Sequence, residues 1–199
     1  MIAVLLGYLA GSVPFAFLLA RRRGVDVRRA GSGNVGAANV MRTTGTGRAI
    51  AVVALDIAKG AAAVGLAYLS SGGLPLVAAT GAAAVVGHIY PVWLRFHGGK
   101  GVAVAAGVFT VLAPFATALA AGLFVLTVWA TRYVSLGSIA ASVALPPAAW
   151  LTGAPGPIVG AAGGSAALIL FRHRANLYRL RAGTERRMSR QRMASDIAR

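Results

Sequence analysis

Residues 102–130, VAVAAGVFTVLAPFATALAAGLFVLTVWA, decide how this chain is folded. Almost every side chain in the stretch is apolar, and Pro114 lies near its middle. Because proline has no N–H to donate and clashes with the preceding helical turn, the stretch can form one kinked helix or two short helices that reverse direction near Pro114. A single helix and a pair that reverses at Pro114 end on opposite sides of the helical layer, so this choice determines on which of the two sides every later segment lies.

The composition of the whole chain indicates a membrane protein. Of its 199 residues, 57% are hydrophobic and 12% are charged, and the mean hydropathy is +0.72. Soluble domains carry about 25% charged residues. Apolar segments of roughly the 17–25 residues that cross a bilayer separate the basic groups, which disfavours a nucleic-acid-binding protein. We therefore expect an all-α integral membrane protein.

Seven apolar segments are predicted to be transmembrane helices, at approximately 2–20, 49–69, 76–94, 102–113, 114–130, 136–151 and 157–171. The first has no basic region before it and no clear cleavage site after it, which favours a retained span over a signal peptide. Residues 1–199 are expected to form a single transmembrane domain, with a basic tail at about 172–199. The chain contains no cysteine, so thiol chemistry is not expected.

The distribution of basic residues favours the hairpin at Pro114. Lys and Arg number 20 against 4 Asp and Glu, a net charge of +16. With a hairpin, 19 of the 20 basic side chains fall on one side, and Lys59 is the exception. The positive-inside rule makes that side the cytoplasm. We expect an external N-terminus, a cytoplasmic C-terminus and four cytoplasmic polar segments, at 21–48, 95–101, 131–138 and 172 onward.

The segment GSGNVG, residues 31–36, matches the glycine pattern of dinucleotide-binding proteins only formally. That pattern needs a strand before it and a βαβ unit around it, whereas an arginine-rich turn precedes this one. What remains is a loop whose backbone N–H groups can bind an anion. Ser32, Asn34 and Asn39 add neutral donors, and the Arg42 guanidinium matches two phosphate or carboxylate oxygens. A flexible cytoplasmic loop explains the same residue types equally well.

A second glycine-rich segment, FHGGKG at residues 96–101, places three glycines around Lys100. The backbone and the ammonium group can therefore approach the same anion. The segment lacks the first glycine and the hydroxyl residue of a Walker A motif, so nucleotide hydrolysis is not indicated. Taken alone, a tight turn with a lysine at the cytoplasmic end of a helix is the simpler interpretation.

Three ionisable groups lie in or near the predicted spans. His88 lies about two helical turns before Arg95, where a lone histidine is more often a structural hydrogen-bonding group than a base. Asp56 and Lys59 are spaced i, i+3 and can neutralise one another on one helix face. Ionisable groups in a membrane segment are commonly functional, but an internal pair is equally consistent with helix packing. The histidines show no metal-ligand spacing, so neither a metal nor a cofactor is expected.

Six segments of the chain, in order and spacing, resemble the bacterial acyl-phosphate:glycerol-3-phosphate acyltransferase family. They read GSVPFAFLLA, GSGNVGAANVMR, LDIAKG, GHIYPVWLRFHGGKGVA, TRYVSLGSIAA and HRANLYRLRAGTE, and they cover nearly the whole chain. The resemblance implies a seven-helix enzyme of the bacterial plasma (inner) membrane with its active site on the cytoplasmic side. It would move a fatty acyl group from acyl phosphate to the sn-1 hydroxyl of glycerol 3-phosphate, giving lysophosphatidic acid and phosphate for phospholipid biosynthesis.

The resemblance also implies site residues and partners. The candidate catalytic residues are Ser32, Arg42, His88, Lys100 and Asn176, and the candidate substrate-binding residues are Gly31, Gly33, Asn34, Asn39, Gly98, Gly99, Gly101 and Ser138. Among these, Ser32, Lys100 and the glycines at 98, 99 and 101 would hold acyl phosphate, while Arg42, Ser138 and Asn176 would hold glycerol 3-phosphate. The expected partners are both substrates, membrane lipid and the enzyme that produces acyl phosphate, but no nucleic acid.

Three points stay open at the level of sequence. The proton of the acceptor hydroxyl can pass to the phosphate of the donor or to His88. The family commonly has Glu where this chain has Ala175, which leaves the arrangement around Asn176 undetermined. A small-anion transporter is the alternative function, although transport needs polar groups near the middle of the membrane and only Asp56 and Lys59 fit that description. A lipid-binding scaffold without activity would not explain the two glycine-rich loops.

Overall fold

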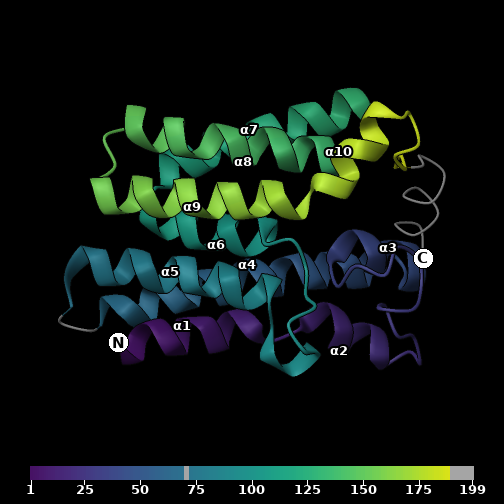
Figure 1. The fold of residues 1–199 in the computed structure, drawn as a ribbon, viewed down its shortest axis with the longest axis horizontal. Helices are drawn as coiled ribbons and strands as arrows, with labels where there is room; N and C mark the ends of the chain where they lie inside the picture. The colour runs from purple at the N-terminus through teal and green to yellow at the C-terminus, as the bar shows by residue number, and fades with distance from the viewer. Residues whose placement is uncertain (70–71, 189–199) are drawn as a thin grey trace.

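The computed structural model describes residues 1–69 and 72–188, which form a bundle of helices joined by short connections (Figure 1). In chain order the elements are α1 (Ile2–Ser12), α2 (Phe15–Arg21), α3 (Ala37–Thr44), α4 (Thr46–Tyr68), α5 (Gly73–Ile89), the 3-10 turn η1 (Val92–Leu94), α6 (Val102–Leu112), α7 (Pro114–Thr131), α8 (Val134–Leu151), α9 (Gly156–Arg172) and α10 (Arg174–Arg181). The predicted tail continues beyond this part of the chain, and its positions 189–199 lie outside the described residues.

The long helices run along one axis of the molecule (Figure 1). The short helices α2, α3 and α10 gather at one end, on the right of the view, and the N-terminus lies at the other end. Within the described part of the chain, five segments are long and apolar enough to cross a membrane, namely Ile2–Arg21, Thr46–Tyr68, Gly73–Leu94, Pro114–Thr131 and Val134–Leu151. The helices Val102–Leu112 and Gly156–Arg172 are apolar but shorter. The all-helical architecture expected from composition is thus confirmed for residues 1–69 and 72–188, and its helices have the length and apolar character of membrane spans.

The hairpin at Pro114 is present. Ala113 leaves the helical conformation (φ −149°, ψ 69°), and Pro114 begins α7, a position at which proline lacks only an N–H that would have no partner in the helix. Gly101, just before α6, and Val134, just after α7, line the same cavity. The chain therefore returns along α7 to the end of the bundle from which α6 started, and the single kinked helix is excluded.

Proline also explains two differences from the predicted spans. The segment predicted as one helix at 2–20 is broken between α1 and α2, because Pro14 disfavours helical geometry at Val13, whose ψ is 116°. The segment predicted at 76–94 stops being α-helical at Ile89, shortly before Pro91, and its last residues form η1.

Two short helices were not predicted. Helix α3 lies in the segment interpreted from sequence as a loop, and α10 lies in the basic tail. Both are rich in polar or basic residues and only eight residues long, so neither shows the long apolar stretch by which the spans were recognised. They form by packing against the bundle, since isolated helices of this length are marginal in water.

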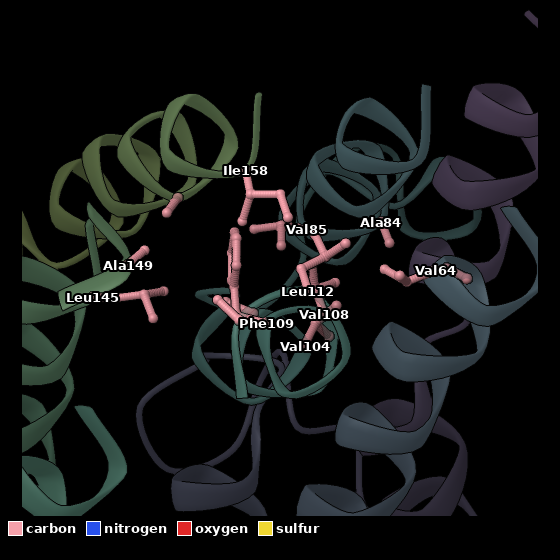
Figure 2. Packing of buried hydrophobic residues seen from close by; sticks show 14 of the residues in the cluster. Val64, Ala84, Val85, Val104, Val108, Phe109, Leu112, Leu145, Ala149 and Ile158 are labelled. Atoms are coloured by element: carbon pink, nitrogen blue, oxygen red, sulfur yellow. The ribbon is translucent and has the colours of Figure 1, made fainter. Parts of the chain in front are cut away.

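Helix α6 lies at the centre of the apolar core. Phe109 is fully buried, and Figure 2 shows it near Val85 of α5, Leu145 of α8 and Ile158 of α9. A helix of 11 residues spans roughly 16 Å, about half the thickness of the hydrocarbon layer. Burial on several sides lets such a short helix end inside the protein without exposing its backbone to lipid.

Candidate functional site

A cavity of about 1810 Å³ reaches into the bundle from the end where α2, α3 and α10 lie. Its wall near that end is polar and basic, formed by the loop before α3, the loop before α6, and α10 with the residues after it. Deeper inside, the wall is apolar and comes from α6, α7 and α8, with Ala106, Ala120, Phe124, Ala141 and Leu145. The cavity thus joins a cationic mouth to an apolar groove.

The first glycine-rich loop is held by the side chain of one buried residue, Asn39, on α3. Its Oδ1 accepts a hydrogen bond from the backbone N–H of Ser32 at 2.8 Å, and its Nδ2 donates to the carbonyls of Val27 and Ala30 at 2.9 and 3.0 Å. Gly31 has a left-handed φ of 65°, and a Cβ there would lie 2.2 Å from Asn39 Oδ1. A side chain at position 31 would therefore displace the amide that holds the loop.

Arg42 projects from α3 over this loop. Its Nη2 donates to the Ser32 hydroxyl at 3.1 Å, while its buried Nε has no hydrogen-bond partner in the described part of the chain. Burial lowers the pKa of the guanidinium from its ordinary value, and the neighbouring Arg186 lowers it further, but an arginine remains charged. Arg42 therefore has donors available for an anion.

Arg28, near the same loop, is already occupied by a carboxylate. Its Nε and Nη2 donate to the two oxygens of Asp26 at 2.9 and 2.7 Å. The hydrogen bonds from Arg28 hold the pKa of the Asp26 carboxyl at about 2. This bidentate pair makes Arg28 less suited than Arg42 to binding a substrate.

The second glycine-rich loop is bound to the end of α5. The N–H groups of Gly98 and Gly99 donate to the carbonyls of Ile89 and His88, both at 3.1 Å. A Cβ at Gly98 would lie 2.2 Å from the His88 carbonyl oxygen, so the approach of the two backbones requires glycine. Arg172, at the end of α9, makes a long contact of 3.4 Å with the Gly98 carbonyl.

Lys100 joins this loop to α10, because its ammonium donates to Oδ1 of Asn176. Burial lowers the pKa of Lys100 to about 8, and Arg42, Arg172 and Arg179 lower it too, whereas Glu185 opposes them. The group is still mostly charged at neutral pH. The site thus holds a buried cation that an anionic ligand would stabilise further.

Glu185, which follows α10, binds two side chains of that helix, Asn176 and Arg179. Its carboxylate accepts hydrogen bonds from Asn176 Nδ2 and Arg179 Nε, both at 2.7 Å. Burial alone would raise the pKa of this carboxyl, but the hydrogen bonds from Asn176 and Arg179 outweigh burial and keep it below the ordinary value. Glu185 therefore places a carboxylate beside Asn176 in a chain that has Ala175 as the preceding residue.

All of the residues predicted for the site line the cavity except Asn39 and Gly99. Asn39 acts from behind the wall through the hydrogen bonds described above, and Gly99 lies against the ring of His88. Sequence reasoning assigned no role to Glu185, Arg172 or Arg179. Glu185 had a usable signal, since it is one of only two acidic residues, with Asp196, in a strongly basic tail, whereas Arg172 and Arg179 are not distinguishable there from the other arginines.

The fold and the cavity together define a class of protein: an integral membrane protein whose site suits a ligand with both a phosphate group and an apolar chain. Residues 1–183 match the family described as glycerol-3-phosphate acyltransferase. The chain belongs to this family, and it is therefore an acyltransferase that acts on glycerol 3-phosphate and not a small-anion transporter.

Relatives and solved structures agree with this assignment. The chain is 50% identical over 186 residues to a glycerol-3-phosphate acyltransferase of Myxococcus xanthus, which covers 92% of this chain and 97% of the relative. It is 47% identical over 189 residues to that of Rubrobacter xylanophilus, covering 92% of each. Two crystal structures of PlsY (YgiH), an integral membrane glycerol 3-phosphate acyltransferase, are also similar. The glycerol 3-phosphate form has a TM-score of 0.91 at 39% identity over 94% of each chain. The lysophosphatidic acid form has a TM-score of 0.89 at 38% identity over 96% of each chain.

Proposed function

We propose that this enzyme transfers a fatty acyl group from acyl phosphate to the sn-1 hydroxyl of glycerol 3-phosphate, releasing lysophosphatidic acid and inorganic phosphate. One observation carries the proposal: a single cavity has the two glycine-rich loops, with Arg42 and Lys100, at its mouth and an apolar groove behind them. Acyl phosphate has these two parts in one molecule. The similar crystal structures of PlsY are a glycerol 3-phosphate form and a lysophosphatidic acid form, which supports the acceptor and the product.

The donor fits along the length of the cavity. Its acyl chain would lie in the groove between α6, α7 and α8, and its phosphate would be held by Ser32, by Lys100 and by the loop of the glycines at 98, 99 and 101. In that loop the N–H groups of Gly98 and Gly99 already donate to the carbonyls of Ile89 and His88, so these two glycines contribute close approach of the backbone and not hydrogen bonds. Glycerol 3-phosphate would bind beside it through Arg42, Ser138 and Asn176. The hydrogen bond between Lys100 and Asn176 supports adjacent donor and acceptor sites.

The chemistry needs little covalent help from the protein, because acyl phosphate is already an activated acid. The sn-1 oxygen attacks the acyl carbonyl carbon, negative charge develops on the carbonyl oxygen, and the bond from carbon to the phosphate oxygen then breaks. Lys100 and the loop N–H groups would stabilise the developing charge, and the two phosphate sites would align the reactants. The hydroxyl proton goes to the departing phosphate or to His88, and the protonation state of His88 decides between them.

Orientation in the membrane can be tested directly, since the chain contains no cysteine. We propose seven membrane-embedded helices, an external N-terminus and a cytoplasmic mouth of the cavity in the bacterial inner membrane. A cysteine at Gly153, between α8 and α9, is expected to react with an impermeant thiol reagent added outside intact cells. A cysteine at Thr184 is expected to be protected until the membrane is opened, and the opposite labelling pattern would contradict this orientation.

The identity of the donor is tested with purified enzyme and glycerol 3-phosphate. With acyl phosphate, phosphate and lysophosphatidic acid are expected in a one-to-one ratio. Acyl-CoA and acyl carrier protein lack the phosphate next to the reacting carbonyl and are expected not to replace it. Efficient acylation from acyl-CoA alone would contradict the proposed donor and the role of Lys100. The enzyme that makes acyl phosphate is a candidate partner, because it must deliver this amphiphile to the same cavity.

A further inference from the structure

The residues that follow α10, at positions 184–188, form a strap at the mouth of the cavity, here called the C-terminal strap. Its path begins where α10 ends. Gly183 adopts the left-handed conformation (φ 68°), and the N–H of Thr184 donates to the Arg179 carbonyl at 2.8 Å. A helix end of this type turns the chain away from the helix axis. Glu185 then binds back to two side chains of α10, which fixes the first end of the strap.

The far end of the strap is attached to the turn between α7 and α8. Nε of Arg187 donates to the Tyr133 hydroxyl at 2.9 Å, and the guanidinium carbon lies 5.0 Å from the centre of the same ring. The backbone N–H of Met188 donates to the Arg132 carbonyl at 2.9 Å. The strap therefore joins α10 to the α7–α8 turn along the wall of the cavity, at the end of the bundle where α3 lies (Figure 1).

Arg186 lies between these two attachments, and its exposed side chain lines the cavity. The guanidinium group forms no hydrogen bond or ion pair with any residue in the ranges 1–69 and 72–188. Burial lowers the pKa of Arg42 on α3, and the charge of Arg186 is near enough to lower it further. Two guanidinium groups from different parts of the chain thus lie near each other at one mouth, where they repel unless an anion lies between them.

The carboxylate next to this pair of arginines is already used. Glu185 accepts hydrogen bonds from Asn176 and Arg179, both at 2.7 Å. A phosphate monoester carries about −1.5 to −2 charge at pH 7 and has three oxygens that accept strong hydrogen bonds. One phosphate can therefore accept from both guanidinium groups and neutralise both charges, whereas one carboxylate brings a single charge.

We infer that Arg186 is a further binding residue for the phosphate of glycerol 3-phosphate, which it holds together with Arg42. The inference rests on the proposed assignment of that phosphate to Arg42. The bound phosphate then connects α3 to the C-terminal strap. Tyr133 is a positioning residue in this arrangement, because it keeps Arg186 at the mouth through its contacts with Arg187.

Calorimetric binding of glycerol 3-phosphate to the enzyme in lipid nanodiscs tests Arg186 without any acyl donor. Arg186→Gln is expected to weaken binding about fivefold, the usual effect of losing one exposed charge-assisted contact. Arg186→Lys keeps the charge and is expected to retain most of the affinity. The matched control is Arg181→Gln, because Arg181 is exposed in the same basic region but does not line the cavity. Unchanged binding in Arg186→Gln, or an equal loss in Arg181→Gln, would overturn the inference.

Steady-state kinetics separate the two phosphates. Arg186→Gln is expected to raise the KM for glycerol 3-phosphate and to leave kcat and the KM of the acyl donor nearly unchanged. The thermal stability of the variant should also be unchanged, because the Arg186 guanidinium has no partner to lose in the described part of the chain. A change confined to the KM of the acyl donor would overturn the inference.

Tyr133→Phe tests the strap itself, since it removes the hydroxyl that binds Arg187 and keeps the ring. It is expected to weaken glycerol 3-phosphate binding when Arg186 is present and to add nothing in Arg186→Gln. An equal further loss in both backgrounds would show that Tyr133 does not act through Arg186.

The inference and the proposed acceptor site can fail separately. Normal binding of glycerol 3-phosphate in Arg42→Gln would contradict the proposed acceptor site. Weak binding in Arg42→Gln with normal binding in Arg186→Gln would overturn the inference alone.

Discussion

The two glycine-rich loops at the mouth of the cavity are held in different ways. The first, around residues 31–36, is fixed by Asn39, whose three hydrogen bonds reach residues only 7 to 12 positions away. The second, around residues 98–101, is fixed by the end of α5 and by Asn176, 76 positions away from Lys100. The first loop is thus a local structure built with α3, whereas the second exists only when α5, α9 and α10 have assembled around it.

This difference predicts how each loop responds to change. A substitution in the first loop should act mainly on the ligand that the loop binds, because its supports lie in the same short segment. Substitutions in the second should affect chemistry and stability together, because its supports are also contacts between helices. The following variants test that distinction, beginning with the largest expected effect.

Lys100→Ala is expected to lower kcat by roughly 10²–10³-fold, the usual effect of removing one preorganised donor from a site of developing charge. The protein should still fold, because the second loop keeps its hydrogen bonds to the carbonyls of Ile89 and His88, but its melting temperature should fall, because the hydrogen bond from Lys100 to Asn176 is lost. Phosphate release from acyl phosphate measures the effect, and size-exclusion chromatography in detergent checks the fold. Near-normal turnover would show that Lys100 has no role in the reaction.

Gly98→Ala is expected to destabilise the enzyme by about 1–3 kcal/mol, the range for overpacking, because its Cβ would lie 2.2 Å from the His88 carbonyl oxygen and 2.4 Å from Pro91 Cδ. The matched variant in the first loop is Gly36→Ala. Gly36 is extended (φ −161°), and its Cβ would meet only the Asn34 amide at 2.9 Å, which can rotate away. Thermal unfolding should separate the two variants, and equal losses of stability would contradict the proposed difference between the loops.

Arg42→Lys is expected to raise the KM for glycerol 3-phosphate about tenfold, since an ammonium cannot reproduce the guanidinium fork and one charge-assisted hydrogen bond contributes about 1.5 kcal/mol or more. Stability should change little, because Arg42 donates to Ser32 within the first loop. Steady-state kinetics with each substrate varied in turn gives the answer. A change confined to the KM of the acyl donor would mean that the two phosphates are assigned to the wrong residues.

The smallest effect is expected from pH. The pKa of Lys100 is lowered by burial to about 8, so its charged form predominates below that pH and is lost as pH rises through it. The value of kcat/KM for the acyl donor should therefore decline above about pH 8. In Lys100→Arg the guanidinium stays charged, and this decline should move to higher pH even if the rate is lower. An identical decline in both enzymes would assign it to another group.

Much of the fold could be predicted from the sequence because its signals are local. Apolar segments indicated the long helices. The hairpin at Pro114, which the structure contains, was indicated by the basic residues, because only a hairpin places nearly all of them on one side. The sequence signals for α3 and α10 were too weak, since these short polar helices form by packing. The breaks at Pro14 and near Pro91 were present in the sequence, but hydropathy averaged over a whole span concealed them.

By itself, the sequence determined the membrane class, and it predicted the side that carries the basic residues and the two loops able to bind anions, since each depends on residue type and short spacing. Only the tertiary structure decided which groups meet. It placed Lys100 against Asn176, brought the Glu185 carboxylate beside that amide, and gave the Lys59 ammonium its contacts with Val13 and His88. These pairs lie between 9 and 76 positions apart in the chain. The physical reason is burial: inside the bundle each polar group must find a partner, and the packing of the helices determines which partner is within reach.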